Sequence, residues 1–144
     1  MDEDLYSPRP LARWYWAGAA VSLLFAIAAG GLFVMHETTN PATLTLDQRT
    51  VFETEPVWVI GAFGVAAIAE AFAAVMLLMR RKIAQPLALI SLVAFVVWLA
   101  GFFANPKLRA VIGANDVAVA VAIAAIAWTI YWFARHSGQR GWLR

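Results

Sequence analysis

Residues 56–79 read PVWVIGAFGVAAIAEAFAAVMLLM, an apolar run that ends at the basic turn Arg80-Arg81-Lys82. At about 1.5 Å per residue, roughly 20 residues of helix cross the hydrocarbon core of a bilayer. This run is therefore long enough to span a membrane, and its one acid, Glu70, falls near the middle. It predicts a transmembrane helix with an ionisable side chain deep in lipid.

The composition places the whole chain in the membrane class. Of its 144 residues, 62% are hydrophobic and 14% are charged, whereas soluble domains average about 45–50% apolar and about 25% charged residues. The chain has no cysteine, which excludes disulfides, thiol catalysis and thiolate metal sites. Its formal net charge of +2 indicates basic membrane loops, and no nucleic-acid partner is expected.

Three further apolar runs predict three more spanning helices. The fold class is therefore all-α: a polytopic, four-transmembrane-helix bundle with up-down connections that forms a single membrane domain over residues 1–144. We expect the four helices over residues 11–35, 56–79, 84–104 and 115–134. The first run exceeds the roughly 7–15 apolar residues of a signal peptide, so we expect it to remain as a helix.

The loops and helix ends carry their own signals. Residues 36–55 form the longest loop, in which Asp47, Gln48 and Arg49 suit the start of a short helix. Asn115 or Asp116 is expected to cap the last spanning helix.

Aromatic residues gather near the ends of the expected helices, which is typical of side chains at the membrane–water interface. One belt is Trp14-Tyr15-Trp16, and a second comprises Trp128, Tyr131, Trp132 and Phe133. We expect Trp142 and Leu143 to return to the interface after the last helix, and the small residues of the helices to form close contacts.

Lysine and arginine bias predicts the orientation. Eight basic residues fall on the side of the termini and of the turn after the second helix, against three on the other side. The first set is Arg9, Arg13, Arg80, Arg81, Lys82, Arg135, Arg140 and Arg144, and the second is Arg49, Lys107 and Arg109. Both termini are therefore expected in the cytoplasm and residues 36–55 in the periplasm, for a multi-pass protein of the bacterial inner membrane.

Glu70 is the main candidate site residue, because an acid at the bilayer centre costs about 2.5–3.5 kcal/mol on insertion scales. Hydroxyls at a similar depth on the other helices make Ser22, Ser91 and Thr129 its candidate hydrogen-bond partners. Two interpretations remain open. Glu70 is either an acid that transports protons or binds a solute, or a hydrogen-bonded packing acid.

Other candidate chemistry is sparse. Trp98 lies further inside its helix than the other tryptophans and is the one candidate for stacking on a ligand. His36 and His136 are expected on opposite sides of the membrane, so no metal site is predicted. No nucleophile–base pair or glycine-rich phosphate loop is present, so we expect no catalytic residues and no cofactor.

Residues 44–92 resemble a family of small bacterial inner-membrane proteins of four predicted helices. The matching features are Asp47-Gln48, Phe52, Pro56, Trp58, the basic turn at residues 80–82, and Ser91-Leu92. The resemblance implies the four-helix fold, and some members are labelled as sugar transporters. In that family the position of Glu70 is often small and uncharged, which favours a packing role.

Two functions follow from these features. The first is a non-enzymatic accessory or scaffold bundle, whose expected partners besides the lipid bilayer are a second copy of the chain or other membrane protein subunits. The alternative is a small-solute or proton-coupled transporter that works as a dimer, because four helices alone rarely enclose a pathway, with Glu70 in that pathway. A lipid-modifying enzyme has the least support, since only residues 36–55 gather polar groups at one level.

Overall fold

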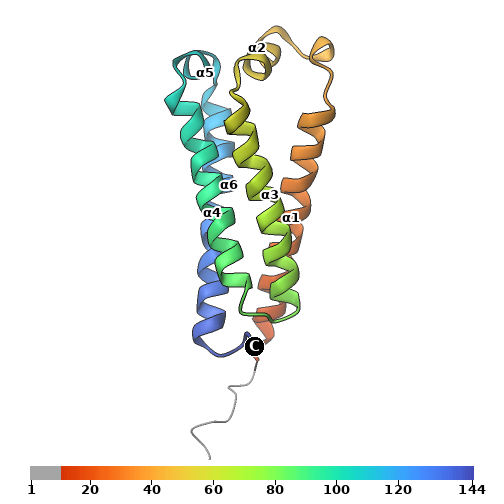
Figure 1. Ribbon diagram of the computed structural model, residues 1–144, viewed down its shortest axis with the longest axis vertical. Helices are drawn as coiled ribbons and strands as arrows, with labels where there is room; N and C mark the ends of the chain where they lie inside the picture. The colour runs from red at the N-terminus through yellow and green to blue at the C-terminus, as the bar shows by residue number, and fades with distance from the viewer. Residues whose placement is uncertain (1–10) are drawn as a thin grey trace, which may run out of the picture.

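The computed structural model describes residues 11–144, and these are all-helical with no strand among them. Four long helices run side by side along the long axis of the molecule (Figure 1). They are α1 (Arg13–Thr38), α3 (Val57–Leu78), α4 (Ala84–Ala104) and α6 (Ala114–Gln139). Each is long and apolar enough to cross a membrane, which confirms the prediction of an all-α chain with four such helices.

Shorter elements lie together at one end of the long helices (Figure 1). They are the 3-10 turn η2 (Pro41–Thr43) and the helices α2 (Leu46–Thr54) and α5 (Pro106–Val111). We call this end the α2 end, and the opposite end, where α3 turns into α4, the turn end. The sequence suggested α2, but residues 106–111 were expected as loop.

The helix α5 begins at an Asn-Pro cap directly after α4. The Asn105 side chain accepts a hydrogen bond from the Lys107 N–H at 3.0 Å, and Pro106 takes the first helical position. Proline suits this position because its missing N–H would have no partner there. The Asn-Pro pair therefore ends α4 and starts α5.

The last helix is longer than expected, and its start differs. It begins at Ala114, with the Asp116 carboxylate accepting a hydrogen bond from the Gly113 N–H at 3.0 Å. It continues to Gln139 and not to residue 134, so the helix extends past the apolar run that set the expected end. The chain leaves the helix through Arg140 and turns at Gly141, whose φ of +72° favours glycine.

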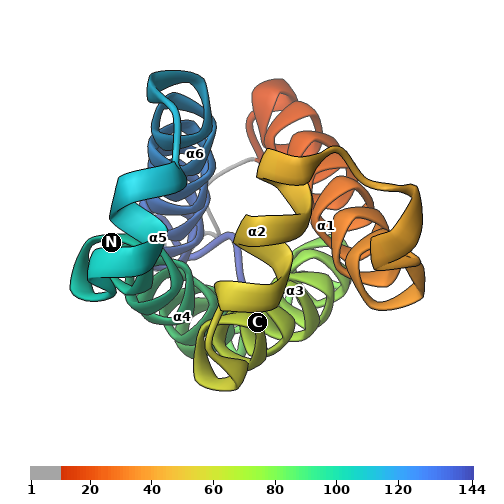
Figure 2. The same ribbon diagram turned by 90° about the horizontal axis from the view of Figure 1, so that it is seen from above.

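The long helices pack in chain order, α1 on α3, α3 on α4, and α4 on α6. The first and the last, α1 and α6, meet near the turn end, where Tyr15 and Phe133 have ring centroids 5.5 Å apart. Towards the α2 end the two helices separate, and α2 lies over the middle of the bundle (Figure 2). The bundle is thus a curved row of helices closed at one end.

Close packing at glycines supports the expected role of small residues. A Cβ atom on Gly101 would lie 2.5 Å from Val59 Cγ2, and one on Gly64 would lie 2.9 Å from the Phe33 ring. At Gly61, by contrast, no atom lies within 4 Å of such a Cβ position. Gly61 is therefore not a contact point within this chain.

The turn end buries three aromatic residues that were expected at the membrane surface: Tyr15, Trp142 and Phe133, which is 6% exposed. Tyr15 is fully buried and its hydroxyl donates to the Leu77 carbonyl at 2.6 Å. Trp142 is 5% exposed, and its carbonyl accepts from Arg80 Nε at 2.9 Å. All three are corrections, and so is Leu143, which is 2% exposed. Trp142 and Leu143 are buried because the chain after Gly141 turns back towards the α3–α4 turn.

Candidate functional site

Glu70 lies in the middle of α3 and is fully buried. Ser91 Oγ, on α4, donates a hydrogen bond to Glu70 Oε2 at 2.7 Å. The other carboxyl oxygen, Oε1, is buried without a hydrogen-bond partner among the described residues. Ala66, Ala73 and Ala74, which share its side of α3, are also fully buried. Glu70 is therefore a desolvated carboxyl group at the contact between α3 and its neighbours.

The other two candidate partners do not reach Glu70. Ser22 Oγ donates to the Gly18 carbonyl of its own helix at 2.9 Å, and Thr129 Oγ1 donates to the Ala125 carbonyl at 2.9 Å. Thr129 is also exposed on the outside of α6. Neither expected contact with Glu70 is therefore present, because each of these two hydroxyls bonds to the carbonyl four residues earlier in its own helix.

An apolar cluster lies between Glu70 and the α2 end. Its buried members are Ala29, Phe63, Ala66, Ala67, Leu92, Phe95 and Ala127. The Phe63 and Phe95 rings meet edge to face with centroids 5.7 Å apart. Glu70 is consequently separated from the cavity described next.

A cavity of about 500 Å³ occupies the α2 end of the bundle. All four long helices line it, α2 covers it, and we call it the α2-end cavity. Its apolar and aromatic lining includes Leu32, Met35, Leu44, Val51, Phe52, Ile60, Phe63, Trp98, Phe102, Val111, Ile112, Val119, Ala120 and Ile123. Its polar lining comprises His36, Thr39, Asp47, Gln48, Glu55 and Asp116.

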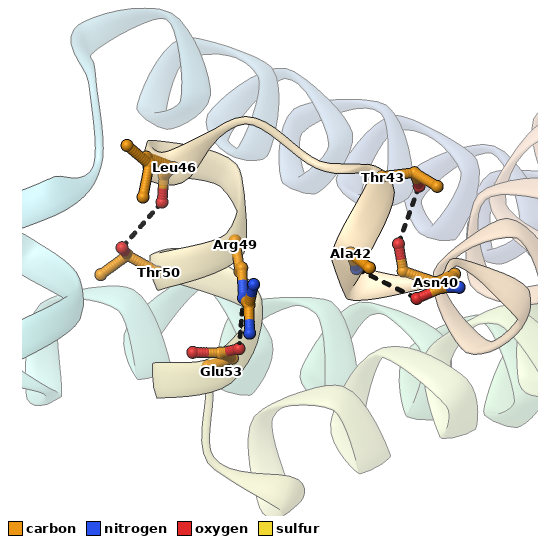
Figure 3. A network of polar contacts seen from close by, with 7 residues as sticks. All are labelled: Asn40, Ala42, Thr43, Leu46, Arg49, Thr50 and Glu53. Carbon is orange, nitrogen blue, oxygen red and sulfur yellow. Dashed lines mark hydrogen bonds and ion pairs between the residues drawn. The ribbon is translucent and has the colours of Figure 1, made fainter.

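The helix α2 has two distinct faces. Residues 47, 48, 51 and 52, followed by Glu55 just after the helix, line the cavity at helical spacing. Arg49 and Glu53 lie on the other face, where Arg49 Nε donates to Glu53 Oε1 at 2.7 Å (Figure 3). The Arg49 charge is thus paired away from the cavity, and no lysine or arginine among the described residues lines it.

Contacts between His36 and the end of α2 fasten α2 to α1. His36 Nε2 lies 3.8 Å from Glu55 Oε2, and the Phe52 ring stacks on the imidazole with centroids 4.6 Å apart. The Glu55 side chain is 8% exposed, and none of the described residues donates a hydrogen bond to its carboxylate. Burial raises the pKa of Glu55 from 4.5 to about 7, since a carboxylate away from water is less stable.

The structure also places the candidate stacking residue Trp98 and the two histidines. Trp98 is half-buried at the cavity wall, with its ring 4.9 Å from that of Phe63 and 5.1 Å from that of Phe102. His36 and His136 lie near opposite ends of the molecule, and His136 stacks on Trp132 at 5.1 Å. Within residues 11–144, no group of three histidine, cysteine or acidic residues is placed to hold a metal ion.

The α2-end cavity was not predicted from the sequence. Its lining comes from five separate parts of the chain, and its acids appear in the sequence as ordinary loop and capping residues. The available signal was the spacing of residues 47, 48, 51, 52 and 55, which places polar and apolar groups on one helix face.

Comparisons of the chain with protein-family models, with characterised proteins and with solved structures find no match.

Proposed function

We propose that the protein is a non-enzymatic, multi-pass protein of the bacterial inner membrane that acts as an accessory or scaffold bundle. The supporting observation is the unequal burial of its helices. In the most apolar stretch of each helix, 22% of residues are buried in α1 and 28% in α6, against 33% in α4 and 50% in α3. The two end helices therefore offer the largest free sides to a second copy or to another membrane protein.

The helix α6 has a side suited to such a contact. Ala118, Ala122, Ala125 and Thr129 are all exposed and follow one another at spacings of three or four residues. In lipid, small side chains at this spacing let two helix backbones approach closely. We propose this side of α6 as the contact with the partner.

The proposed orientation places both termini in the cytoplasm. The basic turn at residues 80–82 and the chain after α6 lie at the same end of the described molecule (Figure 1). The Arg144 N–H donates to the Arg80 carbonyl at 2.6 Å there. Basic residues concentrated at one end support a cytoplasmic turn end and a periplasmic α2 end.

A photo-crosslinking experiment in native membranes tests the scaffold proposal. A benzoylphenylalanine residue at position 122 should give a product larger than the protomer, identified by mass spectrometry as a second copy or another membrane protein. The matched control is the same residue at position 93, since Val93 is also exposed but belongs to the inner pair of helices. No product from position 122, or equal products from both positions, would contradict the proposal.

A second candidate function, a dimeric carrier of protons or a small solute, is favoured by Glu70 Oε1, which is buried without a partner. Proton uptake into proteoliposomes under an imposed potential tests it. Glu70→Gln and Glu70→Ala should abolish the flux, while Ser22→Ala, which alters a hydroxyl bonded to its own helix, should leave it unchanged. Flux that survives both Glu70 substitutions would remove Glu70 from the pathway.

A further inference from the structure

We propose that the α2-end cavity binds a small organic cation with an apolar or aromatic body, which enters from the membrane between α1 and α6. This site is independent of the scaffold contact on the outside of α6. It does not involve Glu70, which lies behind the apolar cluster.

The size and lining of the cavity suit a compact apolar body. About 500 Å³ lies within the range of roughly 300–1,000 Å³ that is usual for small-molecule sites. Phe63, Trp98 and Phe102 form one aromatic wall, with centroid distances of 4.9 Å and 5.1 Å to Trp98. Aromatic faces attract cations as well as apolar groups.

The charges facing the cavity select for a cation. Three carboxyl groups line it, from Asp47, Glu55 and Asp116, and no lysine or arginine of the described chain does. His36 is the one basic side chain at the wall, and it already lies beside Glu55. A phosphate or another anion would meet like charge there, so the cavity does not suit an anionic ligand.

Glu55 is the group that a cation would stabilise most. Its side chain is 8% exposed, lines the cavity and receives no hydrogen bond from the described residues. A buried carboxylate without donors is costly, and a nearby positive charge offsets that cost. The raised pKa of Glu55, about 7, means that a cation and a proton compete for the same carboxylate.

The helix arrangement supplies a route from lipid. The cavity is not closed, and both α1 and α6 line it. These two helices pack together near the turn end but separate towards the α2 end (Figure 2). We therefore place the entry for an apolar cation on the side of the cavity between α1 and α6.

Two probes of matched size and opposite charge test the proposal. Binding of radiolabelled tetraphenylphosphonium and tetraphenylborate is measured on the protein in phosphatidylcholine nanodiscs, with empty nanodiscs as the blank. We expect saturable binding of tetraphenylphosphonium alone. Equal binding of tetraphenylborate, or no saturable binding of the cation, would overturn the proposal.

Substitutions on the two faces of α2 provide the matched comparison. Glu55→Gln should weaken cation binding by about tenfold, the effect of roughly 1.4 kcal/mol of lost attraction. Glu53→Gln, on the face away from the cavity, should leave binding unchanged. Equal effects of the two substitutions, or none from Glu55→Gln in folded protein, would overturn the assignment.

The wild-type protein gives a test that needs no substitution. Cation affinity should rise by about fivefold from pH 6 to pH 8, because the deprotonated fraction of a group with a pKa of about 7 rises about tenfold while the protonated form keeps about a tenth of the affinity. The other titratable groups at the cavity are His36 of α1, Asp47 of α2 and Asp116 of α6, and α3 and α4 contribute none. Affinity that is flat across this range would contradict the role of Glu55.

Photo-crosslinking at position 122 does not depend on any of these outcomes. The cation-binding proposal and the scaffold proposal can therefore be contradicted independently of each other.

Discussion

The Glu70 carboxyl group accepts one hydrogen bond, from Ser91 Oγ on α4. Ser22 and Thr129 lie at a similar depth on α1 and α6, so depth alone does not decide which hydroxyl reaches Glu70. The choice depends on helix rotation, which places Ser91 Oγ 2.7 Å from Glu70 and leaves the other two hydroxyls on their own helices. Depth can be estimated from a sequence, whereas rotation depends on contacts between helices.

Ser91→Ala should destabilise the protein by about 1–3 kcal/mol, because it leaves the buried Glu70 carboxyl group without a hydrogen bond. Ser22→Ala is the matched control. It removes a buried hydroxyl that bonds only to the preceding turn of α1, a bond that adds little to helix stability, so we expect a smaller loss than for Ser91→Ala. Unfolding by heat or by sodium dodecyl sulfate in detergent micelles measures both, and similar losses would contradict the importance of the contact between α3 and α4.

The stability of the protein should depend on pH through Glu55. Its pKa is raised from 4.5 in the unfolded chain to about 7 in the folded one, so the folded state binds the proton more tightly. The free energy of unfolding should therefore fall as pH rises from 4.5 to 7, by at most about 3 kcal/mol, and stay level above 7.

Melting temperatures between pH 4.5 and pH 8 test this dependence, with Glu55→Gln as the reference. The glutamine variant should show a flatter profile, and an unchanged slope would assign the dependence to another group. His36 is the nearest such group, 3.8 Å from the Glu55 carboxylate.

At the scale of elements, the sequence located the four long helices but not all of their ends. Apolar runs indicate where lipid favours helix, so α3 and α4 begin and end close to the expected residues. Hydropathy does not reveal helical segments that are rich in polar residues. This explains why the part of α6 after residue 134 and the short helix α5 were not expected. There the boundaries depend on caps, such as Asn105 and Gly141.

Alanine substitutions at two glycines should distinguish a glycine that packs against another helix from one that faces open space. Gly101→Ala should cost about 1–3 kcal/mol, because the new Cβ would lie 2.5 Å from the buried Val59 side chain. Gly61→Ala faces open space and should stabilise α3 by about 0.5–1 kcal/mol through its higher helix propensity. Thermal unfolding in micelles measures both, and a loss at position 61 would point to a contact with a partner molecule.

At the scale of the whole molecule, the class of fold was predictable because composition alone separates membrane from soluble chains. The separation of α1 and α6 at the α2 end was not predictable, and neither was the cavity it leaves. Hydropathy does not tell which helices are neighbours. Small residues occur on covered and on exposed sides alike, as Gly64 and Gly61 show.

Cysteine labelling tests the proposed orientation with little background, because the natural chain has no cysteine. Thr43→Cys, near the α2 end, should react with a membrane-impermeant maleimide in intact spheroplasts. Gln139→Cys, exposed at the turn end, should react only after lysis. The reverse pattern would place the termini outside the cell and contradict the orientation drawn from the basic residues.

The packing of each long helix on its predecessor bears on how the chain folds during synthesis. Most contacts between the long helices join neighbours along the chain, and α1 and α6 share few. Partners close in sequence find one another quickly, because little loop entropy is lost. The α1–α3 pair can therefore form before α4 leaves the ribosome, and each later helix then adds to a surface that already exists.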